Sequence, residues 1–256
     1  LYYKIYGEGN EEPVLIIAHG LFGSERNWRA VARYLCDRGR KVVAVDMRNH
    51  GKSFWSTGHS YEELGYDIKN VIQKFGDKAD LMGHSMGGKA AMALALETSG
   101  HIRRLVVLDI SPVTYFHNHS EYIGAMEALD LNLFTDRNQL DLQLAKSISD
   151  PSIRAFLLQS VDFTEKSKAK WRLNLNALNN NLTKIMGFPR YSTTSTVPCL
   201  FIRGSLSKYV RDNHVKIIKN YFPNSTLVTI NGAGHWLHVE KKEELCNSAL
   251  SFLTQN

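Results

Sequence analysis

The sequence predicts an α/β protein built on a doubly wound, mostly parallel β-sheet. Two observations lead to this class. Short runs of β-branched and other apolar residues alternate with amphipathic stretches from residue 14 to residue 108. These runs are almost continuously apolar, as expected for strands buried on both faces of a parallel sheet. A length of 256 residues, with 43% hydrophobic and 22% charged residues, fits one large folded unit that carries an insertion.

The elements are expected in a regular order. The first part of the chain has candidate strands at Val14–Ala18, Val42–Asp46, Asp80–Met82 and Leu105–Leu108, and candidate helices at Trp28–Asp37, Tyr61–Phe75 and Met86–Ser99. After Pro112 no strand is expected until Arg190, and the helical stretches are Glu121–Leu129, Arg137–Ser149 and Ile153–Gln159. The alternation then resumes with strands at Cys199–Ile202 and Thr226–Ile230 and helices at Val210–Phe222 and Val239–Leu253. We therefore expect a core at 1–112, a helical lid at 113–190 over the carboxyl ends of the strands, and the rest of the core at 191–256.

Charge and cysteine usage narrow the class of function. Lys and Arg (31) exceed Asp and Glu (25), giving a formal net charge of +6 and a pI of about 9.1. The basic residues are mixed with acidic ones and form no block interleaved with aromatic residues, so nucleic-acid binding is not expected. No apolar run approaches the roughly 20 residues of a transmembrane helix. The distant Cys36, Cys199 and Cys246 suggest reduced intracellular thiols, and the start at Leu1 suggests a trimmed N-terminus from which a targeting segment has been lost.

The sequence Gly83–Gly87 (GHSMG) has the form G-x-S-x-G. It follows a predicted strand and opens a predicted alanine-rich helix, which is the context of a nucleophile elbow. Such a turn strains the backbone of its serine and exposes the hydroxyl, so Ser85 is the candidate nucleophile. The alternative is an ordinary glycine-rich strand–helix turn in which the serine is incidental, and the predicted flanking strand and helix favour the elbow over it. A phosphate-binding loop is disfavoured because Ala90, after Lys89, has no hydroxyl to bind Mg²⁺.

Two further loops carry groups that acyl transfer needs. The loop His19–Ser24 (HGLFGS) follows the first predicted strand and can offer a backbone N–H opposite the elbow. We expect the N–H groups of Leu21 and Met86 to form an oxyanion hole, with Phe22 as the alternative to Leu21. The loop Asn231–His238 follows the last predicted strand, and the chain order Ser, Asp, His makes His235 the candidate base. His238 is the alternative.

The acid of a catalytic triad is the least obvious member. In the α/β-hydrolases, which the elbow and the chain order Ser, Asp, His resemble, the acid usually follows the strand before the histidine-bearing one, but here that slot holds Ser207, which cannot act as an anion. Asp212 lies further on, at the start of the next helix, where it is typical of a cap. Asp109 ends the run Leu105–Leu108 beside the elbow strand, so Asp109 is the candidate acid. A purely local role for Asp109, capping a turn through the Ser111 amide, is the alternative.

Other candidate sites are weaker. His117 and His119 offer two metal ligands without a suitably spaced third, and no metal or cofactor is expected. The stretch Asp46–Gly51 is interpreted as scaffolding near the pocket. Aromatic side chains are expected to line an apolar acyl pocket, although aromatic residues at helical spacing are equally typical of a lid core. These residues are Phe22, Phe134, Phe156, Trp171 and Trp236.

Six segments together resemble one branch of the α/β-hydrolases, the α/β-hydrolase-domain-11 proteins and the bacterial YbfF-type esterases. The segments are His19–Ser24, Val45–Ser53, Gly83–Lys89, Asp109–Val113, Trp171–Leu178 and Gly232–His238. The resemblance implies a serine hydrolase acting on short- to medium-chain esters, acylglycerols or thioesters, with the acid on the earlier strand, as at Asp109. For eukaryotic members it also implies a mitochondrial location and association with lipoylated 2-oxoacid dehydrogenase complexes.

We therefore expect a carboxylic ester hydrolase that passes an acyl group from Ser85 to water. Two alternatives stay open: an acyltransferase that uses an alcohol instead of water, and a binding protein that keeps the fold to protect a partner. Epoxide hydrolase and dehalogenase chemistry are disfavoured because they need a carboxylate in place of Ser85.

Overall fold

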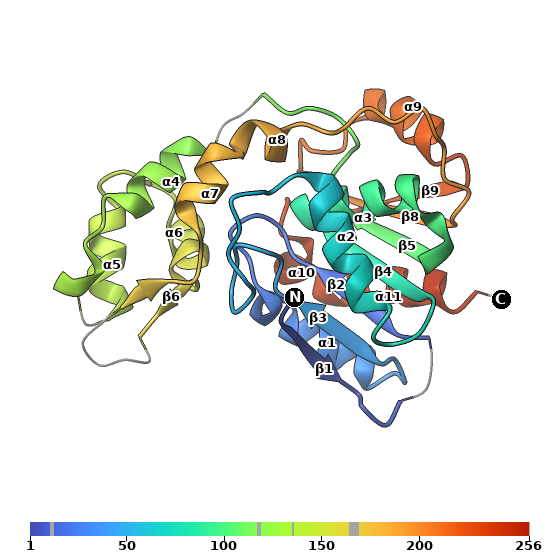
Figure 1. Ribbon diagram of the computed structural model, residues 1–256, viewed down its shortest axis with the longest axis horizontal. Coiled ribbons are helices and arrows are strands. Elements are labelled where there is room, and N and C mark those ends of the chain that lie inside the picture. The colour runs from blue at the N-terminus through green and yellow to red at the C-terminus, as the bar shows by residue number, and fades with distance from the viewer. Residues whose placement is uncertain (11–12, 117–118, 135, 164–168, 256) are drawn as a thin grey trace.

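The computed structural model describes residues 1–10, 13–116, 119–134, 136–163 and 169–255. Its centre is a seven-stranded sheet in the order β1-β3-β2-β4-β5-β8-β9 (Figure 1). The strands are β1 (Tyr3–Tyr6), β2 (Leu15–Ala18), β3 (Val42–Val45), β4 (Ala79–His84), β5 (Ile102–Leu108), β8 (Cys199–Gly204) and β9 (Ser225–Ile230). All neighbouring pairs run parallel except β1 and β3. The predicted fold class, a mostly parallel α/β sheet, is confirmed.

Helices cover both faces of the sheet (Figure 1). One face packs against α1 (Arg29–Cys36) and α11 (Lys242–Leu253), and the other against α2 (Tyr61–Ile72), α3 (Met86–Glu97) and α9 (Asp212–Tyr221). The strands supply both layers because successive side chains point to opposite faces. In β2, Leu15 and Ile17 belong to one apolar cluster, whereas Ile16 and Ala18 belong to the other.

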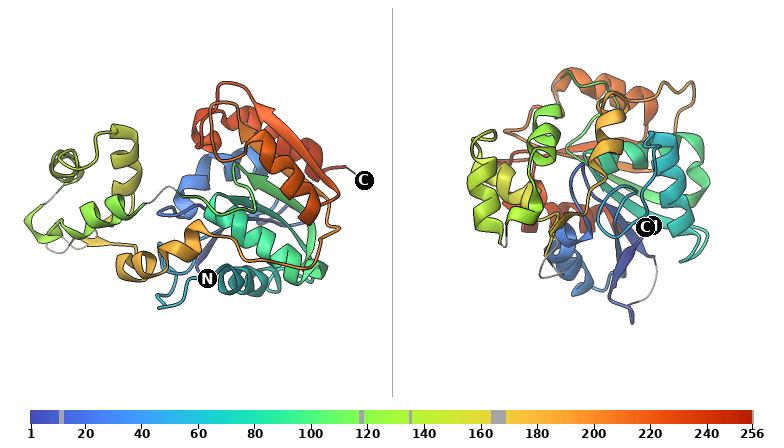
Figure 2. Two further views of the ribbon diagram at one scale, coloured as in Figure 1. Left: turned by 90° about the horizontal axis from the view of Figure 1, so that it is seen from above. Right: turned by 60° about the vertical axis from the view of Figure 1, so that its left-hand side comes forward.

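The lid lies between β5 and β8 in the sequence and to one side of the sheet in space (Figures 1 and 2). It contains α4 (Ser120–Glu127), α5 (Arg137–Leu144), α6 (Pro151–Leu158), β6 (Val161–Asp162), β7 (Lys170–Trp171), α7 (Leu175–Asn180) and α8 (Leu182–Met186). Backbone bonds fix it to the core. The Gly51 N–H donates to the Arg172 carbonyl over 2.7 Å, and the Asn174 N–H donates to the Asn49 carbonyl over 3.0 Å.

Several short elements differ from the expectation. β1 was not predicted because its sequence YKIY has no apolar run, and this edge strand forms through backbone pairing with β3. The lid was expected to hold no strand, but β6 and β7 pair over two residues each. The helices α7 and α8 are too short to show a period, and α7 begins at the cap formed by the Asn174 side chain. The last predicted helix is divided into α10 (Leu237–Glu240) and α11. Among the described residues, no helix has the length and apolarity needed to span a bilayer.

Candidate active site

Ser85 occupies the sharp turn between β4 and α3. Its backbone has φ 51° and ψ −118°, a conformation that side-chain-bearing residues rarely adopt. The turn requires glycine at two places, since a Cβ on Gly83 would collide with the Gly87 carbonyl and a Cβ on Gly87 with the Ala18 carbonyl. The backbone N–H of Ser85 donates to the Leu108 carbonyl over 3.1 Å. The elbow is thus clamped between the two neighbouring strands, and the Ser85 side chain lines a cavity.

His235 and Asp109 form a hydrogen-bonded pair at the edge of this cavity. His235 lies on the loop after β9, and its Nδ1 is 2.7 Å from Oδ2 of Asp109. Asp109 directly follows β5, has a φ of 47° and is fully buried. The Gly204 N–H donates to Asp109 Oδ1 over 3.2 Å, and the Ser207 hydroxyl donates to Oδ2. The buried carboxylate therefore has partners on both oxygens, as a charged group in an apolar interior requires.

The two competing acid positions have other hydrogen-bond partners than His235. Ser207, which fills the usual acid slot, instead supports Asp109 through its hydroxyl. Asp212 is the first residue of α9, and its exposed carboxylate pairs with Arg203 over 2.7 Å. The Ser111 N–H donates to the Tyr115 hydroxyl over 2.9 Å rather than to Asp109, so the local capping alternative does not describe this turn.

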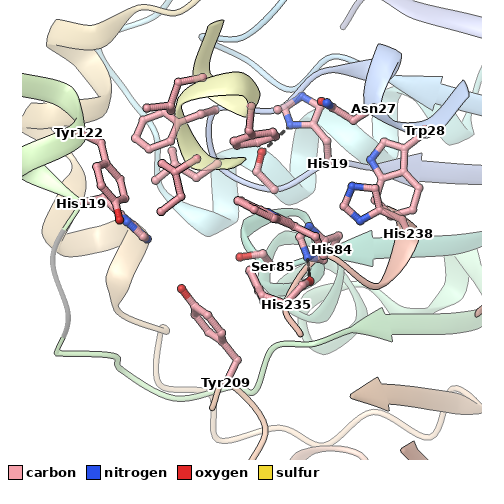
Figure 3. Close-up of a pocket in the computed structure, with 18 of the residues that line it drawn as sticks. His19, Asn27, Trp28, His84, Ser85, His119, Tyr122, Tyr209, His235 and His238 are labelled. Carbon is pink, nitrogen blue, oxygen red and sulfur yellow. Dashed lines mark hydrogen bonds between the residues drawn. The ribbon is translucent and has the colours of Figure 1, made fainter. Parts of the chain in front are cut away.

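Two aromatic side chains that the sequence reasoning did not single out pack against the His235 ring. The Tyr209 ring stacks on it, with centroids 3.9 Å apart and planes 20° apart. The His84 ring lies 4.6 Å away, and its Nε2 donates to the His235 carbonyl over 2.9 Å (Figure 3). Burial lowers the pKa of His84 well below its ordinary value, so this imidazole stays neutral. His84 was visible as the residue before Ser85, whereas nothing in the sequence indicated Tyr209.

His238, the alternative base, is buried and stacks on Trp28 with ring centroids 4.5 Å apart. Burial, and next the proximity of His235, lower the pKa of His238 to about 4. Asp109 contacts His235 and not His238. The geometry therefore favours a packing role for His238.

The candidate oxyanion groups lie on either side of Ser85. Met86 is the first residue of α3, where the backbone N–H has no acceptor within the helix. The Phe22 N–H is already used, because it donates to Nε2 of His50 over 3.1 Å. This bond joins the 19–24 loop to the 46–51 turn, in keeping with the scaffolding role expected for that turn. Leu21 remains the candidate in this loop, and it lines the cavity beside Ser85.

A cavity of about 340 Å³ opens beside Ser85 and His235, between the core and the lid (Figure 3). Phe22, Phe156 and Trp236 line it, as expected. Phe134 and Trp171 do not, and this part of the expectation is corrected. Both pack into the apolar cluster beneath the lid, and the Trp171 Nε1 donates to the Met126 carbonyl over 3.2 Å. A helical lid needs a core of its own, which sequence spacing does not distinguish from a pocket lining.

The two candidate metal ligands, His117 and His119, give little support for a metal site. His117 lies outside the described residues, and His119 lines the cavity with its ring stacked on Tyr122. Within the described residues, no three His, Cys, Asp or Glu side chains are grouped to hold a metal ion.

Comparisons with known proteins identify the family of this chain. The model of the family described as "alpha/beta hydrolase fold" matches residues 13–242. The chain belongs to the α/β-hydrolase family. It is 38% identical to a Danio rerio protein named "sn-1-specific diacylglycerol lipase ABHD11" over 262 residues, which is 99% of this chain and 82% of the relative. It is 34% identical to "Esterase YbfF" of Escherichia coli, over 95% of this chain and 94% of the relative. The resemblance to this branch is thereby confirmed.

Two further similarities bear on the whole chain. A solved structure titled "Marine microorganism esterase" superposes with a TM-score of 0.93 at 34% identity, over 98% of both chains. A Saccharomyces cerevisiae relative named "Probable alcohol acetyltransferase" is 33% identical over 99% of this chain and 80% of its own length. The similarity thus extends through the lid as well as the core of this α/β-hydrolase.

Proposed function

We propose that this α/β-hydrolase is a carboxylic ester hydrolase that uses a Ser85-His235-Asp109 triad. The observation that carries the proposal is the hydrogen bond from the His235 imidazole to a fully buried Asp109, at a cavity that Ser85 also lines. Relatives named as esterase and lipase, each covering almost the whole chain, support the same reaction. Small-molecule esters are the substrate class.

The reaction proceeds in two steps through an acyl-enzyme. Ser85 Oγ attacks the ester carbonyl while His235 Nε2 takes its proton, and the N–H groups of Leu21 and Met86 stabilise the oxyanion. The alcohol leaves with the proton from His235. Water then attacks the acyl-Ser85 ester, His235 takes a proton from it, and the acid departs as Ser85 regains its hydrogen.

The hydrogen bond to Asp109 has a specific purpose in this cycle. It fixes the proton on Nδ1 of His235, so that Nε2 is free to act as the base. The stacked Tyr209 ring and the His84 bond to the His235 carbonyl hold the imidazole in place. The apolar cavity wall, with Phe156 from the lid and Trp236 from the core, suits the acyl chain of the ester.

Transfer of the acyl group to an alcohol is the second candidate reaction. The relative named as a probable alcohol acetyltransferase favours it, since it aligns with almost the whole chain. The same triad would serve, with an alcohol replacing water in the second step. The mitochondrial association with lipoylated dehydrogenase complexes rests on the family resemblance alone, and no specific observation favours the partner-protecting role.

A fluorophosphonate probe followed by a panel of p-nitrophenyl esters of increasing chain length separates these candidates. The hydrolase predicts labelling at Ser85 and turnover of the esters, and both are lost in Ser85→Ala, whose melting temperature stays near that of the parent. Labelling of Ser85 without hydrolysis of the esters would favour the transferase, provided that an added alcohol acceptor restores turnover of the esters. Folded protein that is not labelled would contradict the enzyme proposal.

A further inference from the structure

A second, much smaller cavity adjoins Ser85. Its volume is about 20 Å³, compared with about 340 Å³ for the main cavity. The two cavities share the walls Leu21, Ser85, His119 and Tyr209, so they meet at the nucleophile. The walls that belong to the small cavity alone include Met86 and Lys89 of α3 and Met186 of α8. We call this small cavity the side pocket.

Lys89 is a buried cation without a carboxylate partner among the described residues. It lies one helical turn after Ser85, and its Nζ donates to the carbonyls of Met186 over 3.0 Å and Gly187 over 2.6 Å. The Tyr115 and Tyr61 rings lie 4.7 Å and 5.6 Å from Nζ. Burial lowers the pKa of Lys89 to about 7. Both the ammonium and the neutral amine donate hydrogen bonds, so the contacts with 186 and 187 survive either state.

Lys89 binds the segment where the two ends of the lid meet. We call this segment the lid neck (Tyr115 and 185–187). The Tyr115 N–H donates to the Met186 carbonyl over 2.9 Å, which joins the incoming and outgoing chain. The Tyr61 hydroxyl donates to the Ile185 carbonyl over 2.5 Å. Three successive carbonyls at the end of α8 therefore receive donors from the core or the opposite end of the lid. The last carbonyls of a helix find no N–H donor within the helix, so those that are shielded from water need a donor from elsewhere in the protein.

We propose that the side pocket is the subsite for the smaller arm of the ester, and that Lys89 is the positioning residue that fixes its wall. The lid neck forms that wall, and Lys89 ties it to the same helix that begins at Ser85. The main cavity takes the larger arm. This inference rests on the proposed ester hydrolysis and specifies its substrates as esters with one short and one long arm.

The volume of the side pocket sets the size of the short arm. A volume of roughly 10–15 Å³ by this measure accommodates one water-sized group. The side pocket therefore has room for a methyl-sized group and not for a butyl or pentyl chain. A longer arm enters only if the lid neck moves, and the bonds of Lys89 to 186 and 187 oppose that movement.

Three isomeric esters of one formula test the subsite: methyl decanoate, nonyl acetate and pentyl hexanoate. Their carbon count is identical, so the total apolar surface scarcely differs. We expect kcat/KM for the better of the two unsymmetrical isomers to exceed that for pentyl hexanoate by at least about tenfold. The preferred isomer shows whether the alcohol or the acyl arm enters the side pocket. Equal or faster cleavage of pentyl hexanoate would overturn the proposal, whereas hydrolysis of none of the three would instead contradict the proposed function.

Lys89→Met tests the positioning role, with Lys184→Met as the matched control on the exposed face of α8. Methionine keeps the length and apolar stem of Lys89 but donates no hydrogen bond. We expect the discrimination between isomers to fall several-fold in Lys89→Met and to stay unchanged in Lys184→Met. Tyr61→Phe, which removes a neighbouring bond of the lid neck, should act in the same direction and serves if Lys89→Met does not fold. Unchanged discrimination in folded Lys89→Met would show that Lys89 does not fix the wall.

Discussion

His235 Nδ1 lies 2.7 Å from Asp109 Oδ2, although 126 positions separate the two residues in the chain. Asp109 directly follows β5 and His235 lies on the loop after β9, and β8 lies between these strands in the sheet. The close approach depends on Gly204 at the end of β8, because a Cβ there would collide with the Ala233 carbonyl. The bare backbone of β8 lets the histidine loop lie over the strand and reach the acid. The pairing of His235 with Asp109 therefore depends on the ends of three neighbouring strands, β5, β8 and β9.

Replacing His235 and His238 in turn should show which of the two histidines is the base. His235→Ala removes the proton acceptor, and we expect kcat/KM on p-nitrophenyl butyrate to fall by roughly 10⁴-fold or more. His238→Ala removes a side chain stacked on Trp28, so we expect a lower melting temperature and less than about a tenfold loss of kcat/KM. A greater kinetic loss in His238→Ala would show that the base is misassigned.

Phe156 and Trp171 should behave differently, although both are half-buried lid aromatics. Phe156 lines the cavity and packs against Trp236 at a centroid distance of 5.5 Å. Phe156→Ala should reduce kcat/KM on long-chain esters more than on acetate, since each methylene contact is worth about 0.8 kcal/mol. Trp171→Ala is the control, which should lower the free energy of unfolding by up to about 3 kcal/mol and affect all chain lengths equally. Equal effects of Phe156→Ala on every ester would place it in the lid core instead.

Buried histidines should make the fold sensitive to acid. Burial lowers the pKa of His19 and His238 to about 4 and that of His50 and His59 to about 3. Below the ordinary pKa of about 6.5 these histidines are protonated in the unfolded chain but not in the folded chain. The free energy of unfolding therefore falls as the pH drops from 6.5 toward 4. Each histidine contributes up to about 1.4 kcal/mol per pH unit in that window.

Two carboxyl groups oppose this trend. Burial raises the pKa of Asp46 and Glu25, so these groups take up protons earlier in the folded state. They are fewer than the buried histidines, and we expect the loss of stability to prevail. Urea unfolding at pH 7 and pH 5 measures it, and His59→Gln should reduce the difference between the two values relative to His101→Gln, a surface control. Equal stability at both pH values in the parent protein would contradict the expectation.

The sheet and the elbow could be predicted because each is marked by a local pattern in the sequence. Apolar runs mark the buried strands, and the G-x-S-x-G pattern marks the elbow, where Gly83 is required by a contact within the turn and Gly87 by contact with the carbonyls of Ala18 and His19. β1 was missed because an edge strand is defined by its partner β3 rather than by its own composition. The two-residue strands β6 and β7 were missed for the same reason, whereas α7 and α8 are too short to show a helical period.

The parts of the site that escaped prediction depend on contacts between distant segments. Ser207 was recognised only as unsuited to be the acid, while the fold turns its hydroxyl into a donor for Asp109. Tyr209 reaches the His235 ring from a loop with no motif. Phe134 and Trp171 are lid aromatics like Phe156, and only the folded structure shows that Phe156 alone of the three lines the cavity.

The position of the acid directly after β5 is the most specific element of the proposed triad, and one pair of isosteric variants tests it directly. Asp109→Asn keeps the shape of the side chain but removes the charge that orients His235 and stabilises its protonated form. We expect kcat on p-nitrophenyl butyrate to fall by about 10⁴-fold at pH 7, with KM little changed. Asp212→Asn, the same change at the exposed start of α9, should leave kcat within about twofold. A large loss in Asp212→Asn with an active Asp109→Asn would contradict the account.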